Sequence, residues 1–160
     1  MIDVKVKMNA EEIVMNLEKL EKKIQRKFVR KAMREGAKVL LNEARARVPV
    51  RTGNLQKSLG ISVKTKKGNL EMHVSPRTVK ESKAHKKVLV GHTKKGKPIY
   101  KYYTPTGKLV PDGYYGRFVE LGTKKMSARP FLRPAFEAKG EEAVKAFRNT
   151  LKRLLDEYRG

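Results

Sequence analysis

The chain has 160 residues, a length typical of one domain with its own hydrophobic core. It contains no cysteine, which excludes disulfide bonds, thiolate metal sites and a cysteine nucleophile. There are 39 Lys and Arg residues against 16 Asp and Glu, giving a net charge of +23. This charge favours acidic protein or nucleic acid as a partner, although a solvated basic surface explains it equally well.

Residues 2–8 alternate apolar and charged side chains, which is the period of a half-buried strand. A signal peptide would instead contain a continuous apolar run, and no segment is long enough to be a membrane span. We therefore expect a soluble protein without a membrane partner.

A long amphipathic helix is predicted to follow this strand. Asn9 is a good N-cap, and Glu12 stands where it can complete a capping box. Apolar residues then recur every three or four positions as far as Val48, and Pro49 ends the pattern. A continuous helix of this length would be on the order of 55 Å long, so it either bends near Gly36 or reaches a neighbouring molecule.

The middle of the chain predicts a β-hairpin and then an arm. Residues 61–66 and 70–75 alternate again, and residues 67–69 suit a short hairpin connection. Residues 76–113 hold ten cations, two acidic residues and four of the seven prolines. Because so long a segment without clear periodicity is usually functional or disordered, we interpret it as a projecting arm, either a basic loop or a β-ribbon, inserted into a single domain of residues 1–160.

Residues 115–121 are predicted to form a strand, and residues 131–158 carry the apolar stripe of a final helix. The predicted fold class is α+β. A small antiparallel sheet packs against the long N-terminal helix and the C-terminal helix, because a half-apolar sheet and two striped helices must cover each other.

The sequence predicts no enzyme, no metal site and no cofactor. Residues 91–98 match the spacing of a phosphate-binding loop, but Pro98 replaces the hydroxyl residue that would hold magnesium, and a strand-like stretch follows. The three histidines, His73, His85 and His92, lack the supporting carboxylates that a metal site or a catalytic base needs.

Tyrosines interleaved with lysines give the arm two interpretations. They can stack on bases and contact phosphates, or they can fill a subunit interface, which we favour because tyrosine has an apolar body and a polar tip. No helix-turn-helix, zinc-finger or RNP signature is present. The candidate assembly or DNA-facing residues of the arm are Lys94, Lys95, Lys97, Tyr100, Lys101, Tyr102, Tyr103 and Lys108.

Glu120 is a lone carboxylate among many cations between the predicted strand and the final helix. We interpret it as one half of a charge-assisted pair that orients a turn, with a solvent-facing strand residue as the alternative. Gly122 permits the turn, prolines restrict the approach to the helix, and Phe131 supplies a buried anchor.

Two blocks together resemble a known family. Residues 48–59 contain the pattern P-x-x-T-G-x-L-x-x-S-L, and residues 115–135 contain Y-x-x-x-V-E-x-G-T followed by R-P-F-L-x-P-A. In order and spacing they are similar to the head-tail joining proteins of long-tailed bacteriophages, also called minor tail component or tail-completion proteins. The arm departs from the family pattern, because it is longer than the few residues needed there.

The resemblance implies a virion protein without catalysis, located in the tail or neck region and in the host cytoplasm during assembly. It implies a homo-oligomeric ring, with six copies the natural number, that contacts neighbouring neck and tail proteins and flanks double-stranded DNA through nonspecific electrostatics. The alternative is a sequence-nonspecific basic nucleic-acid-binding protein. The resemblance assigns structural roles to Pro49, Thr52, Gly53, Leu55, Ser58, Glu120, Gly122, Thr123, Pro130, Phe131 and Pro134.

Overall fold

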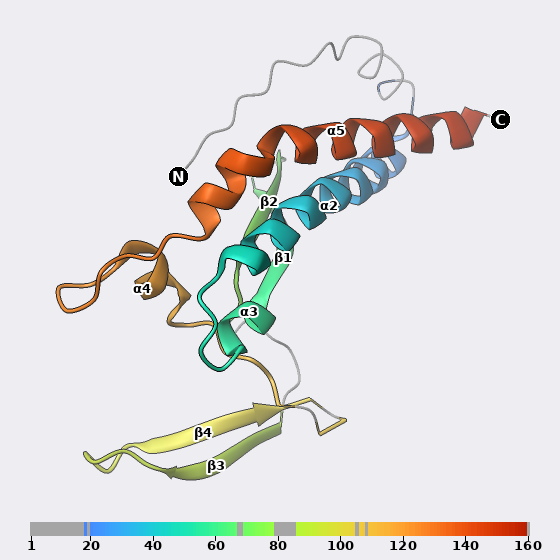
Figure 1. Cartoon of the computed structure of the whole chain (residues 1–160). Coiled ribbons are helices and arrows are strands. Elements are labelled where there is room, and N and C mark those ends of the chain that lie inside the picture. Colours follow the sequence, from blue (N-terminus) through green and yellow to red (C-terminus); the bar gives the residue numbers. More distant parts are fainter. Residues whose placement is uncertain are drawn as a thin grey trace. The chain divides into compact units, whose positions relative to one another are not determined.

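The computed structural model shows a mixture of helices and small antiparallel sheets, which confirms the predicted α+β class (Figure 1). It describes residues 18, 20–66, 69–78, 86–104, 106–107 and 109–159. The described elements are α2 (Lys22–Arg47), α3 (Asn54–Ser58), β1 (Leu59–Lys66), β2 (Asn69–Pro76), β3 (Lys86–His92), β4 (Pro98–Tyr103), α4 (Gly116–Leu121) and α5 (Leu132–Arg159).

The chain divides into two compact units, and each is described by itself. Unit 1 comprises Met1–Glu43, Ile61–Val74 and Pro134–Gly160. Unit 2 comprises Ala44–Gly60 and Ser75–Arg133.

The predicted N-terminal helix is interrupted before α2. The strand predicted over residues 2–8 and the helix start predicted at Asn9 lie outside the described residues. Leu20 and Glu21 are not helical and α2 begins at Lys22, so the prediction of one continuous helix from Asn9 is wrong. The other end agrees within one residue, because α2 ends at Arg47, shortly before a proline that could not continue it.

In unit 1, α2 and α5 lie side by side (Figure 1). Ala32, Leu151 and Leu155 form a buried cluster, and Phe28 and Phe147 pack against it. Pairing of these stripes removes apolar surface from water, which is the main stabilisation available to two amphipathic helices.

Gly36 lies at a close approach between these helices. The residue is helical, and a Cβ atom added to it would lie 2.6 Å from the main-chain oxygen of Ala143. The contact therefore requires a residue without a side chain, and this steric requirement explains a glycine in the middle of a helix.

Strands β1 and β2 form the predicted hairpin sheet. Only two residues separate Lys66 from Asn69, a connection that antiparallel strands alone can make. In unit 1, the guanidinium of Arg30 on α2 donates a hydrogen bond of 2.9 Å to the hydroxyl of Thr65 on β1. Helix and sheet are thus joined by a polar contact.

The arm contains a two-stranded ribbon, one of the two forms predicted for it. Strands β3 and β4 pair antiparallel from Lys86 opposite Tyr103 to His92 opposite Pro98, with a bulge between Leu89 and Gly91. Aromatic and β-branched residues favour this extended conformation. The phosphate-loop pattern of residues 91–98 therefore leads into a strand, as expected, and not into a helix.

The strand predicted over residues 115–121 is wrong, because Gly116–Leu121 form helix α4. The amide of Val119 donates to the carbonyl of Tyr115 at 3.2 Å, and Gly122 donates to Phe118 at 2.9 Å. Phe118 and Val119 favour strands intrinsically, but the local turn of the chain overrides that preference. Helix α3 was not predicted, since five residues are too few to show a helical period.

A pair of glycine substitutions tests the helix contact. Gly36→Ala should lower the free energy of unfolding by about 1–2 kcal/mol, because the new methyl group overpacks the contact with Ala143. Gly140→Ala on α5, where an added Cβ meets none of the described residues within 4 Å, should raise it by up to about 1 kcal/mol through helix propensity. Urea unfolding followed by circular dichroism measures both, and equal effects of the two substitutions would contradict the packing shown.

Candidate functional site

The site begins with the Glu120 carboxylate, which caps helix α5 from within unit 2. Glu120 Oε2 accepts hydrogen bonds from the amides of Phe131 at 2.8 Å and Leu132 at 3.0 Å. Glu120 Oε1 accepts one from the amide of Arg133 at 3.0 Å. These donors belong to the first turn of α5, whose N–H groups have no partners inside the helix. A negative charge there also interacts favourably with the helix dipole.

The sequence around the helix start explains why a distant carboxylate is needed. Neither Pro130 nor Phe131 has a side-chain oxygen that could serve as a local N-cap. Pro134 has no N–H group, so the three amides bound by Glu120 are followed by a position that needs no acceptor. The Glu120 carboxylate therefore accepts hydrogen bonds from the three consecutive amides that precede Pro134.

Residues 122–131, the capping loop, return the chain from α4 to α5. The amide of Arg129 donates to the carbonyl of Val119 at 2.8 Å, and Thr123 donates to Met126 at 2.8 Å. Gly122 has a φ of 73°, and a Cβ on it would lie 2.8 Å from the amide nitrogen of Ala128. Both its conformation and its surroundings thus favour glycine.

Phe131 ends this loop as a fully buried side chain, while Pro130 before it is exposed. The ring of Phe131 is buried, and the amide of the same residue donates a hydrogen bond to Glu120. The start of α5 is therefore fixed by one apolar and one charge-assisted contact.

The partner of Glu120 differs from the prediction. A cationic side chain was expected, but main-chain amides donate the three bonds shown. The alternative, a solvent-facing strand residue, fails because Glu120 is helical and half-buried. The missing N-cap before Leu132 was the one signal in the sequence that could have indicated this arrangement.

The first block also folds within unit 2. Gly53 precedes α3, and Thr52 Oγ1 lies 3.5 Å from the amide of Asn54. The hydroxyl of Ser58 donates to the carbonyl of Leu55 at 2.7 Å, and both residues are buried. Pro49, which lies between α2 and α3 in the sequence, is half-buried.

The two ends of the arm meet beside the first block. The amide of Arg77 donates to the carbonyl of Ser58 at 3.0 Å, and the amide of Gly113 donates to the carbonyl of Arg77 at 2.9 Å. The backbone of Gly116 lies against Leu55 and Pro76. The first block, the arm base and the start of α4 therefore form one packed group in unit 2.

The candidate residues of the arm lie on the ribbon and its tip. The tip turns through Thr93 and Gly96, where the amide of Gly96 donates to the carbonyl of Thr93 at 2.8 Å. Lys87 Nζ lies 3.7 Å from the ring centroid of Tyr100, a cation–π contact on one face. Lys108 lies outside the described residues. The other candidates are the exposed Lys94, Lys95, Lys97 and Lys101 and the half-buried Tyr102 and Tyr103.

Within the described ranges, no group of three His, Cys, Asp or Glu side chains is placed to hold a metal ion. His73 lies 3.5 Å from Glu71, His92 lies on the ribbon, and His85 is outside the described residues. None of the helices described is both long and apolar enough to span a membrane.

Substitution of Glu120 tests the cap. Glu120→Ala should lower the free energy of unfolding by about 1–3 kcal/mol, because the amides of the first turn lose a charged acceptor. Glu120→Gln retains one oxygen and should cost less. Glu141→Ala, an exposed acidic residue of α5, is the matched control and should change stability by less than about 0.5 kcal/mol. Equal losses at positions 120 and 141 would contradict the capping role.

Searches among curated proteins and among solved structures found no match. A family model, HK97-gp10_like, described as "Bacteriophage HK97-gp10, putative tail-component", matches residues 11–122. That range covers more than two thirds of the chain and includes the first block, the arm and Glu120. The chain therefore belongs to the HK97-gp10 family of bacteriophage tail components.

Proposed function

We propose that this tail component works at the junction between tail and neck, as a ring of copies around the path of the DNA. The observation that carries this proposal is the ribbon. Residues 86–103 contain six lysines and no acidic residue. Six copies are the natural number for a ring that matches the symmetry of a tail.

The ribbon is poorly covered by its own chain. Leu89, Val90 and Ile99 are 49%, 45% and 43% exposed. An isolated two-stranded ribbon is marginally stable in water, so these side chains favour a partner surface that covers them. The proposed partners are a second copy of the chain and the neighbouring neck and tail proteins.

A ring repeats one heterologous contact, so each copy needs two different complementary surfaces. We assign one of these to the arm, residues 76–113, as an insertion in a single domain. Its support is the hydrogen bond between Arg77 and Gly113, which brings the two ends of the arm together as an inserted segment requires. The motif residues around Ser58 and Glu120 then serve to hold the arm base and the start of α5.

The lysines of the arm suit contact with phosphates. Phosphate contacts depend on charge and carry no sequence information, which is what a channel for any DNA sequence requires. The +23 charge of the chain supports the same interpretation. In this function no side chain makes or breaks a covalent bond, and no cofactor is needed.

The alternative is a basic protein that binds nucleic acid without forming a ring. Negative-stain images of the purified protein separate the two, because only the proposed function predicts closed rings. Mass spectrometry of purified virions adds a second criterion. Absence of the protein from finished particles would contradict a structural role in the tail.

Deletion of residues 80–110 tests the role of the arm in assembly. We expect a folded monomer that assembles poorly, because the ends at Arg77 and Gly113 already lie together. Size-exclusion chromatography with light scattering and a thermal unfolding curve measure assembly and folding separately. Loss of cooperative unfolding would show instead that the arm belongs to the core.

Charge removal at the ribbon tip tests the DNA contact. Replacing Lys94, Lys95 and Lys97 by Gln should weaken binding to any duplex and reduce the slope of log K against log salt by up to about 0.9 for each phosphate that the protein no longer neutralises. Replacing Lys23, Lys27 and Lys31, three exposed lysines of α2, removes the same charge and should have a smaller effect. Fluorescence anisotropy with two unrelated duplexes at two salt concentrations measures both.

Three results would contradict the proposed binding to DNA. They are a strong preference for one sequence, binding that is insensitive to salt, and equal reductions of affinity in the two triple variants. The last would mean that net charge alone, and not the ribbon, determines the affinity.

A further inference from the structure

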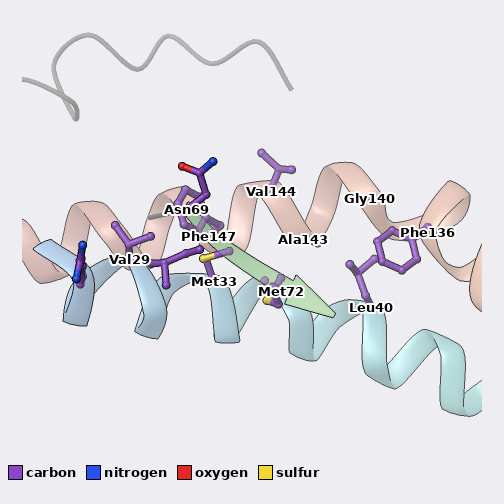
Figure 2. Close-up of a pocket in the computed structure, with 13 residues that line it drawn as sticks. Val29, Met33, Leu40, Asn69, Met72, Phe136, Gly140, Ala143, Val144 and Phe147 are labelled. Atoms are coloured by element: carbon purple, nitrogen blue, oxygen red, sulfur yellow. The ribbon is translucent and has the colours of Figure 1, made fainter. Parts of the chain in front are cut away.

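Unit 1 contains an apolar cavity of about 560 Å³ between α2, α5 and β2. Figure 2 shows Met33 and Leu40 of α2, Met72 of β2, and Phe136 and Phe147 of α5 around it. The polar side chains in its lining are those of Arg26 and Asn69. The cavity therefore suits an apolar occupant.

The walls of this cavity are incompletely covered. Gly36, Leu40 and Ala143 are the buried residues of its lining. The larger side chains around them are only half-buried, although they are apolar and could gain about 25 cal/mol for each Å² removed from water. These half-buried residues are Val29, Met33, Leu70, Met72, Phe136, Val144 and Phe147.

Of the two strands of this sheet, β2 lines the cavity. Asn69, Leu70 and Met72 of β2 line it, whereas none of the described β1 residues does. In the described part of the chain, β2 pairs with β1 in a sheet of two strands. Two strands are marginal on their own, and an edge with free N–H and C=O groups is a template for a further strand.

We propose that residues 2–8 of the same chain occupy this cavity as a third strand along β2. Their sequence, Ile-Asp-Val-Lys-Val-Lys-Met, places apolar and charged side chains at alternate positions. Successive side chains of a strand point to opposite faces. One face would therefore present four apolar side chains to α2 and α5, while the other keeps one aspartate and two lysines in water.

The dimensions of the segment and the cavity agree. The α2 wall runs from Arg26 to Leu40, which is about 21 Å along a helix axis. A strand from residue 2 to residue 8 is about 20 Å long. The four apolar side chains can therefore contact the whole length of the cavity.

The chain is also long enough to return to the cavity. Leu20 packs against the cluster of Ala32, Leu151 and Leu155 in unit 1. Residues 9–19 are predicted to be helical, and a helix from residue 8 to Leu20 spans about 18 Å. Arg26, the near end of the α2 wall, is six residues beyond Leu20, or about 9 Å at the rise of a helix. Residue 8 can therefore reach the near end of the cavity, with residue 2 toward the far end.

The absence of cysteine makes a disulfide scan the direct test. Cysteine is placed at each position from 2 to 8 in turn, in a full-length chain that carries Met72→Cys. A disulfide requires Cα atoms about 4.4–6.8 Å apart and side chains on the same face. After mild oxidation, we expect intramolecular disulfides several-fold more often at the even, apolar positions than at positions 3, 5 and 7, as measured by mass spectrometry.

A second series carries Leu70→Cys in place of Met72→Cys. It tests the register between the N-terminal segment and β2. Leu70 and Met72 lie on the same face of β2, so the preferred partner should move by two residues along the N-terminal segment. The direction of that move distinguishes a parallel from an antiparallel third strand. Circular dichroism of each reduced variant checks that the fold is retained.

Several outcomes would overturn the proposal. They are equal reaction at all seven positions, no reaction in either series, a preferred position that does not move, and disulfide-linked dimers in place of intramolecular bonds. Dimers would mean that the segment of a second copy is the occupant.

A stability measurement provides an independent check. Val4→Asp should lower the urea midpoint of unfolding, because it places a charge among apolar side chains. Lys5→Asp, on the opposite face, should leave the midpoint within error. Equal midpoints for the two variants would contradict the proposed position of residues 2–8 in the cavity.

Discussion

The structure of unit 2 depends on one charge placed at one helix end. Glu120 binds the amides of Phe131, Leu132 and Arg133, which otherwise lack acceptors because no capping side chain precedes α5. The capping loop can then be closed by main-chain hydrogen bonds alone, with Gly122 in the conformation that the turn requires. A single carboxylate thus replaces the local cap that the sequence lacks.

This constraint gives the motif residues a physical meaning. Glu120 and Gly122 shape a turn, and Ser58 and Leu55 form a packed base beside the two ends of the arm. In this structure they hold the two ends of the arm and the start of α5. Membership of a tail-component family agrees with the proposed function, in which a stable base would present a basic ribbon to larger partners.

Local signals in the sequence predicted part of this fold, and tertiary contacts determined the rest. The alternation around Val63 and Met72 predicted the hairpin, and the apolar stripe through Leu151 predicted α5, because those patterns reflect which face is buried. Helix α4 was missed because Phe118 and its neighbours favour strands intrinsically. The donors to Glu120 lie 11 to 13 residues away, a separation that no local periodicity encodes.

Hydrogen exchange at the amides of residues 131–133 tests this account most directly. If the Glu120 carboxylate holds them, nuclear magnetic resonance should show these three amides strongly protected, unlike the exposed first-turn amides of an uncapped helix. Their exchange should be selectively faster in Glu120→Gln, while amides in the middle of α5 keep their rates. Free exchange of all three amides in the native protein would contradict the account.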